Sequence, residues 1–138
     1  MKEIGWDSSY KLATIIDARI GECKTNVIRA FLDYRNMLPG DAVIVEGLHL
    51  IGGQVYGHAW IETPEYIIDP TIVCEENESL KETVKYDKVR ELEENLVRKE
   101  YSEQTRTPGT RILVNIDYDD PDIQRRIRIL EGFDFENH

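Results

Sequence analysis

Three side chains that together have the chemistry of a nucleophile, a base and an orienting acid occur in the order Cys23, His58 and Asp69. Cys23 follows Gly21 and Glu22, His58 lies in the string Gly-His-Ala-Trp-Ile-Glu, and Asp69 lies in Ile-Ile-Asp-Pro-Thr. A thiol attacks a carbonyl carbon as the thiolate, and an imidazole accepts its proton best when a carboxylate fixes the imidazole tautomer. The three residues therefore have the composition of a catalytic triad.

The segment around Cys23 is predicted to be helical. A first helix, capped by Ser8 or Ser9, has apolar residues at helical spacing at Leu12, Ile15, Ile16 and Ile20. Gly21 interrupts it, and a second helix continues through Val27, Ile28, Phe31 and Leu32 and ends before Pro39-Gly40. Cys23 then falls in the first turn of the second helix, where the free N–H groups and the helix dipole favour an anion and lower a thiol pKa.

His58 and Asp69 are predicted to lie on neighbouring antiparallel strands. A strand from about Ala42 turns at Gly52-Gly53 into a second strand over 54–62, and a third short strand covers 66–69. If the loop 62–65 is symmetric, His58 and Asp69 face each other with Cβ atoms about 4.5–5.5 Å apart. The symmetric glycine turn also places Gly47 beside His58, which leaves room for the imidazole. A slip of one residue would send His58 and Asp69 to opposite faces.

With these strings in this order, the chain resembles the transglutaminase-like branch of the papain-type cysteine proteinase fold, over roughly residues 20–71. The resemblance implies an α+β fold with helices packed on an antiparallel β-sheet, and Cys23 as nucleophile, His58 as general base and Asp69 as orienting acid. It also implies an oxyanion donor upstream of the cysteine, for which Trp6 is the tryptophan candidate. The chain departs from the family at Lys24, where transglutaminases often carry an aromatic residue. Lys24 would favour the thiolate and Glu22 would oppose it.

Each of these residues also has a purely structural interpretation. A small cysteine on an amphipathic helix is often core, a strand histidine often packs, and Asp before Pro often begins a turn. Trp60 and Tyr56 share the His58 face and either wall an acyl pocket or belong to the core. A zinc site made of His49, His58 and Cys23 lacks the tight ligand pairs of structural zinc sites, so neither a metal nor a cofactor is predicted.

Composition limits the class of protein. The chain has 138 residues, of which 41% are hydrophobic, and this matches one domain over 1–138. Its formal charge of −10 disfavours nucleic acid and anionic membranes as partners and favours neutral or basic ones. A peptide or protein is the expected substrate, as the resemblance implies. Two cysteines, no basic and apolar leader and no apolar run of membrane-spanning length together indicate a cytoplasmic location.

The catalytic core is expected over about 8–72, and a charged helical and C-terminal strand and helix region over about 75–138. Residues 75–104 are predicted to form one or two solvated amphipathic helices, with apolar positions at Leu80, Val84, Val89, Leu92 and Leu96. A strand is expected over 111–116. Asp120 should cap a helix that has Pro121 at its first position, buries Ile123, Ile127 and Leu130 and ends at Gly132.

The sequence therefore predicts a cysteine enzyme that transfers or hydrolyses an acyl group of an amide or peptide substrate. Hydrolysis is favoured, because no feature for binding an acceptor is visible. The alternative is a noncatalytic module of the same fold that uses its acidic helices to bind a protein partner.

Overall fold

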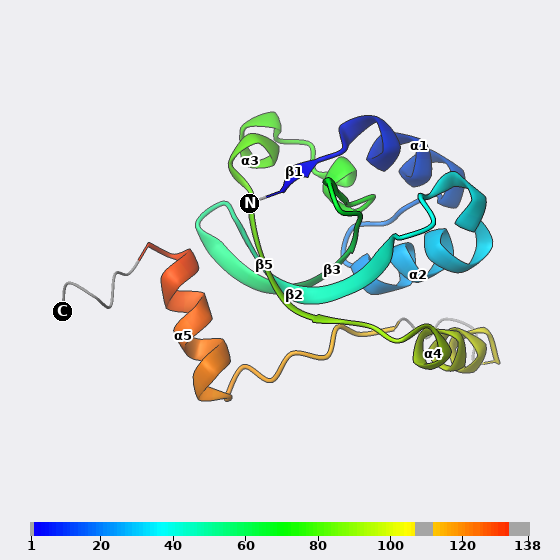
Figure 1. Cartoon of the computed structure of the whole chain (residues 1–138). Coiled ribbons are helices and arrows are strands. Elements are labelled where there is room, and N and C mark those ends of the chain that lie inside the picture. Colours follow the sequence, from blue (N-terminus) through cyan, green and yellow to red (C-terminus); the bar gives the residue numbers. More distant parts are fainter. Residues whose placement is uncertain (1, 107–111, 133–138) are drawn as a thin grey trace.

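The chain folds as an α+β structure, and in the part that the structure describes five helices pack around one five-stranded mixed, mostly antiparallel sheet (Figure 1). This computed structural model describes residues 2–106 and 112–132. The helices in this part of the chain are α1 (Trp6–Ile16), α2 (Cys23–Asp33), α3 (Glu78–Thr83), α4 (Glu94–Arg106) and α5 (Pro121–Leu130). The strands are β1 (Glu3–Ile4), β2 (Val43–Ile51), β3 (Gln54–Glu62), β4 (Tyr66–Ile68) and β5 (Lys85–Glu91), in the spatial order β1-β4-β3-β2-β5. None of the described helices is both long and apolar enough to span a membrane.

The main core lies between the sheet and the first two helices, which run side by side on one side of it (Figure 1). Helix α1 contributes Leu12 and Ile16, while α2 contributes its buried apolar face. The first helix begins at Trp6 with Gly5 as its N-cap, so the prediction of a cap at Ser8 or Ser9 was wrong. It also ends earlier than predicted, because Asp17 adopts a left-handed conformation with φ of 53°. The second helix begins at Cys23, as predicted.

The hairpin of β2 and β3 has the predicted register. Both turn glycines have positive φ, 59° at Gly52 and 77° at Gly53, which the tight two-residue turn requires. Gly47 therefore pairs with His58, as expected. The reason for a glycine there differs from the prediction: a Cβ on Gly47 would lie 2.7 Å from the Trp60 ring and 2.2 Å from the Asp87 carbonyl oxygen. The space is filled by Trp60 and by the backbone of β5, so it is not left open for the imidazole.

The register between β3 and β4 differs from the prediction by two residues. Glu62 pairs with Ile67 and Ile61 with Ile68, because Thr63 and Tyr66 close a tighter turn than the symmetric loop 62–65. Asp69 is therefore not directly opposite His58. A shift of two keeps both residues on one face of the sheet, since side chains alternate with a period of two. His58 and Asp69 are therefore close to each other, as expected, but as diagonal neighbours rather than as a directly opposed pair.

Strand β4 is short, and this leaves an edge of β3 open. Its pairing with β3 covers Ile61 and Glu62, and Pro70, which has no N–H to donate, follows Asp69 directly. The edge of β3 at His58 and Ala59 is thus not occupied by β4. The first residue of α2 fills this place, because the Cys23 side chain is hydrogen-bonded to the Ala59 backbone and to the His58 ring.

Residues 75–104 contain two helices, α3 and the first part of α4, as predicted, but also a strand that was not predicted. Between α3 and α4 the chain forms β5, which pairs antiparallel with β2 and places Tyr86 opposite His49. The apolar positions of this segment are spaced closely enough to imitate a helix, but the chain here completes the sheet edge. Tyr86 and Ile4 pack against a second apolar cluster, formed by Val45, Trp60 and Ile67 on the sheet face opposite α1 and α2.

In the C-terminal part of the chain, the predicted helix forms but the predicted strand does not. Residues 112–116 form no strand, and Arg111 lies outside the described residues. This segment is held instead by side chains of the core, since the Thr25 hydroxyl accepts from Ile112 N–H and the Glu46 carboxylate accepts from Asn115 N–H. Helix α5 forms as expected, with Asp120 accepting the Asp122 N–H as its cap. Ile123 is buried, whereas Ile127 and Leu130 are only half-buried.

Candidate active site

The structure brings Cys23, His58 and Asp69 together at the open edge of β3. The His58 Nε2 lies 2.7 Å from Asp69 Oδ2. The same imidazole is also hydrogen-bonded to the Cys23 thiol. With Nε2 engaged by the carboxylate, Nδ1 is the ring nitrogen left for the sulfur. Both cysteines are free thiols.

The two oxygens of the Asp69 carboxylate have different hydrogen-bond partners. Oδ1 accepts the backbone N–H groups of Thr71 and Ile72, at 3.1 and 3.3 Å, and so closes the turn expected for Asp before Pro. Oδ2 faces His58. The turn and the triad are therefore not alternatives for this residue. The Asp69 backbone N–H also donates to the Ser9 hydroxyl at 3.0 Å, which fixes the turn to α1.

Tyr86 is a member of the site that the sequence did not reveal. Its hydroxyl donates to Asp69 Oδ2 at 2.8 Å, the same oxygen that holds His58. Burial and the charge of Asp69 raise the pKa of Tyr86 far above its ordinary value, so the phenol remains a donor. The sequence carried a signal for it, a tyrosine at an alternating position of 85–91, but this segment was assigned to a helix.

The electrostatics favour a thiolate and imidazolium pair. Burial alone would raise the pKa of Cys23, but the hydrogen bond and the charge of His58 outweigh burial and lower it. Burial likewise disfavours a charged His58, yet the charge and hydrogen bond of Asp69 raise the pKa of His58 to about 10. The pKa of Asp69 is lowered despite its burial, because His58 and Tyr86 stabilise the carboxylate. The directions of the three shifts therefore favour a proton on His58 and a negative charge on Cys23.

Helix α2 is pinned to the Asp69 turn by a buried asparagine one turn after the cysteine. The Asn26 amide donates to Thr71 Oγ1 at 2.9 Å and to the Arg19 carbonyl at 2.8 Å, and its own oxygen accepts the Arg19 N–H. Every polar group of this side chain thus connects the helix to a neighbouring segment. The position of Cys23 relative to Asp69 is set by these bonds rather than by flexible loops.

Lys24 has a structural role. It is buried and its ammonium forms ion pairs of 3.0 Å with both Glu46 and Glu100. Arg90 pairs with the other oxygen of Glu46 at 3.3 Å. The Lys24 charge is therefore compensated by carboxylates on the helix side of the sheet. Instead of the predicted role in favouring the thiolate, Lys24 anchors α2 to β2 and α4.

A second histidine lies against the first. The rings of His49 and His58 are stacked, with centroids 3.9 Å apart and planes 3° from parallel. Burial and the adjacent His58 lower the pKa of His49 to about 3, so it is uncharged at neutral pH. Its Nδ1 has no hydrogen-bond partner among the described residues. The neutral ring confines one face of the His58 imidazole.

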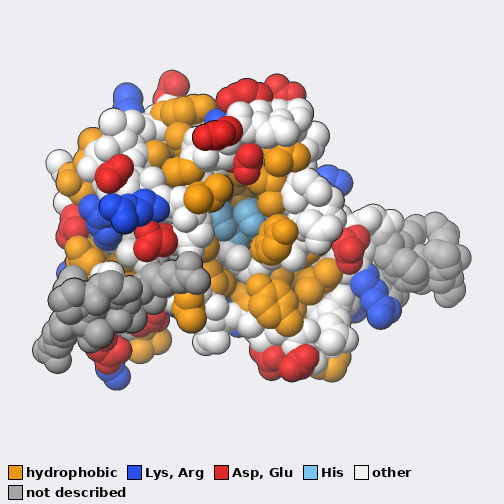
Figure 2. Space-filling model, turned by 180° about the vertical axis from the view of Figure 1, so that it is seen from behind, with side chains coloured by type: hydrophobic (Ala, Val, Ile, Leu, Met, Phe, Trp, Pro, Cys, Tyr) orange, Lys and Arg blue, Asp and Glu red, His pale blue; other side chains and the backbone are white. Residues whose placement is uncertain are grey.

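A pocket of about 390 Å³ opens onto the thiol. Its lining includes Cys23, His49, His58 and Tyr56, and Figure 2 shows the histidine side chains at the bottom of a hollow with hydrophobic groups around it. Tyr56 is half exposed at its wall. Trp60 does not line it: the indole is fully buried, donates to Glu62 Oε2 at 2.9 Å and packs edge to face against Tyr86. Of the two aromatic candidates, one is in the pocket wall and the other in the core.

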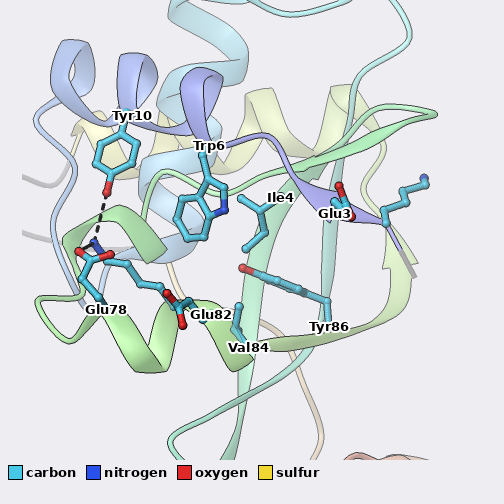
Figure 3. A pocket seen from close by; sticks show the side chains of 10 residues that line it. Glu3, Ile4, Trp6, Tyr10, Glu78, Glu82, Val84 and Tyr86 are labelled. Atoms are coloured by element: carbon cyan, nitrogen blue, oxygen red, sulfur yellow. Dashed lines mark hydrogen bonds and ion pairs between the residues drawn. The ribbon is translucent and has the colours of Figure 1, made fainter.

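Trp6 lies in a different and larger pocket, of about 640 Å³. Figure 3 shows its ring between Tyr10 and Ile4, with Tyr86 on the other side of the cavity. Cys23 and His58 do not line this pocket. The structure thus does not bring Trp6 to the nucleophile, and Tyr86 is the residue that this cavity shares with the hydrogen bonds of Asp69. The assignment of Trp6 as an oxyanion donor stays an untested prediction.

Within residues 2–106 and 112–132, no group of three or more His, Cys, Asp or Glu side chains is arranged to hold a metal ion. No family model, curated protein or solved structure matches the chain. The functional assignment therefore depends on the geometry of the site itself.

Proposed function

We propose that the chain is a cysteine acyl-transfer enzyme of the transglutaminase-like type, with Cys23 as nucleophile, His58 as general acid and base and Asp69 as orienting acid. The observation that carries the proposal is the continuous chain of contacts from the thiol through the imidazole to the carboxylate, open to a pocket at the thiol. The arrangement also agrees with the resemblance, which implies a cysteine at the start of a helix and the other two residues on adjacent antiparallel strands.

The geometry supports a two-step reaction. The Cys23 thiolate attacks the carbonyl carbon of an amide, a C–S bond forms, and the carbonyl oxygen becomes an oxyanion. The backbone N–H of Cys23 belongs to the first turn of α2, whose N–H groups have no acceptor within the helix, and we assign it as a donor to this oxygen. When the C–N bond breaks, the His58 imidazolium gives its proton to the leaving amine and a thioester remains.

Hydrolysis completes the cycle. Neutral His58 accepts a proton from a water molecule, whose oxygen attacks the thioester carbon, and Cys23 leaves as the thiolate while His58 keeps the proton. The acid product departs and the ion pair is restored. An amine in place of water would give a transferase. We favour a peptidase or amidase, because the described residues that line the pocket at Cys23 include a single acidic side chain, Glu75, and no acidic cluster that would bind an amine acceptor.

The proposal is tested by alkylation with iodoacetamide across pH, with the adduct located by mass spectrometry. Alkylation forms an S–C bond and expels iodide, so it reports the thiolate. Cys23 should label well below the ordinary thiol pKa of about 8.5. In His58→Ala its labelling at pH 7 should fall at least about tenfold, since an ordinary thiol is only a few per cent ionised there. Cys74, in the same molecule, is the control and should label equally in both proteins.

The opposite result would support the noncatalytic module. Labelling of Cys23 that follows an ordinary thiol titration, and that is the same in wild type and His58→Ala, would show that the imidazole does not activate the sulfur. Circular dichroism of the variant, and His58→Gln as a second substitution, distinguish loss of activation from loss of the fold.

A further inference from the structure

The walls of the pocket at Cys23 are mainly apolar. Four large side chains from separate parts of the chain line it, namely Ile20, Ile51, Tyr56 and Ile72. Two of them are left open to solvent, Ile20 at 67% and Tyr56 at 50% exposure. Large apolar side chains that remain exposed around a concave surface are typical of a ligand site. The volume of about 390 Å³ is near the lower end of the range of about 300–1,000 Å³ for such sites.

The charges of the lining are unsuitable for an anion. Among the residues that the structure describes, neither a lysine nor an arginine lines the pocket, and the one acidic residue in its lining is Glu75. The Cys23 and His58 charges compensate each other, and His49 is uncharged. A carboxylate in this space would lose its water without gaining a cation, and it would face Glu75.

We propose that this pocket selects the acyl donor, and that it takes an uncharged apolar side chain beside the carbonyl carbon that Cys23 attacks and rejects a side chain that carries a carboxylate. The inference rests on the proposed function, since it assigns the substrate class of the same site. The apolar side chain would cover the exposed surfaces of Ile20 and Tyr56 and remove this apolar area from water.

Matched alkylating amides test this selectivity. Three N-substituted iodoacetamides, with isobutyl, carboxyethyl and aminoethyl groups, have the same reacting carbon as iodoacetamide but differ in the group offered to the pocket. Their rates at Cys23 and at Cys74 are measured in the same sample by mass spectrometry. Because both thiols experience the same net charge of −10, the ratio at Cys74 corrects for repulsion by the whole molecule. The isobutyl amide should exceed each charged amide at Cys23 by about tenfold, beyond any preference at Cys74.

A charge placed in the wall should reverse the preference. Ile20→Lys puts a cation at the pocket, whereas Leu96→Lys makes the same change on α4, at a residue that is 57% exposed and does not line the pocket. Ile20→Lys should raise the carboxyethyl to isobutyl ratio at Cys23 by about tenfold. Leu96→Lys should leave it unchanged. A ratio of probes is used because a nearby lysine also lowers the thiol pKa and so speeds every probe alike.

Failure of this inference differs from failure of the proposed function. Fast labelling by plain iodoacetamide that depends on His58, with equal rates for the three substituted amides, would overturn the apolar pocket and leave the thiol chemistry intact. A preference for the aminoethyl or carboxyethyl amide would overturn it as well. Slow labelling by plain iodoacetamide, independent of His58, would remove the proposed function and this inference together.

Discussion

Substitution of Tyr86 tests how much its hydrogen bond to Asp69 contributes to the site, because it leaves the other contacts of Asp69 in place. In Tyr86→Phe the carboxylate loses the donor at 2.8 Å but keeps His58 and its two backbone N–H groups. Without this donor the Asp69 carboxylate is held less firmly towards His58, so its charge should stabilise the imidazolium less, and the pKa of Cys23 should rise as a consequence. We expect the pH profile of Cys23 alkylation to shift upward, with the rate at low pH about threefold to tenfold lower.

Tyr101→Phe is the matched control for this change. Its hydroxyl also donates to a carboxylate, Asp33 at 2.7 Å, but on the outer side of α2. An equal shift of the Cys23 profile in both variants, or none in Tyr86→Phe, would contradict the role of Tyr86 as a positioning residue.

At the scale of residues, the sequence predicted the triad but not what surrounds it. Cys23, His58 and Asp69 are recognisable by type and by the strings in which they lie. Tyr86 and Ser9 act on Asp69 through single hydrogen bonds from remote segments, and no local pattern marks such contacts. His49 was considered only as a metal ligand, although the predicted register of β2 and β3, in which it lies two residues after Gly47, already placed it near His58 on one face of the sheet.

Gly47 determines how closely β5 approaches the sheet. The pairing of β2 with β5 shifts between Glu46 and Gly47, and an added Cβ at Gly47 would collide with the Asp87 carbonyl oxygen at 2.2 Å and with Trp60 at 2.7 Å. Gly47→Ala should therefore lower the free energy of unfolding by about 3 kcal/mol, because a backbone atom cannot move aside. Urea unfolding measures this change.

Gly40→Ala is the control, since a Cβ there has no neighbour within 4 Å. It should unfold within about 0.5 kcal/mol of the wild type. A wild-type midpoint for Gly47→Ala would show that β5 does not pack against β2 as described. Because β5 carries Tyr86, a stable but shifted β5 would also raise the pH at which Cys23 becomes reactive.

At the scale of elements, the first half of the chain was predictable and the second half largely was not. The glycine turn fixed the β2 and β3 register, because both residues have the positive φ that few other residues accept. The β3 and β4 register was wrong by two, because Thr63 closes a tighter turn than symmetry of the loop implies. Strand β5 was missed because its pairing depends on contacts with β2 more than 30 residues earlier, and these outweigh local spacing.

At the scale of the whole molecule, the ion pair makes a distinctive contribution to stability as pH changes. With Cys23 as the thiolate, as we propose, the folded protein holds one proton on the pair, on His58, up to a pKa of about 10. The unfolded chain also holds one between about pH 6.5 and 8.5, on the cysteine. Proton uptake is then equal in both states, so the pair adds no pH dependence to the stability in this window.

Removal of the thiol should expose the contribution of His58. In Cys23→Ala the raised pKa of His58 stabilises the folded state fully below about pH 6.5, and this stabilisation is lost as pH rises towards the folded pKa. The free energy of unfolding of Cys23→Ala should therefore fall relative to wild type between about pH 6.5 and 8.5. Parallel curves from urea unfolding at several pH values would contradict a charged His58.

The most direct test of the account is titration of the Cys23 thiolate by its ultraviolet absorbance, taken as the difference between wild type and Cys23→Ala. We predict a thiolate that persists well below the ordinary thiol pKa of about 8.5, because His58 holds the Cys23 pKa down. The same titration in His58→Ala should move above that ordinary value, since burial and Asp69 then act on the thiol against the Ala59 backbone hydrogen bond alone. A wild-type thiolate that appears only at or above about pH 8.5 would contradict the ion pair and, with it, the proposed enzyme.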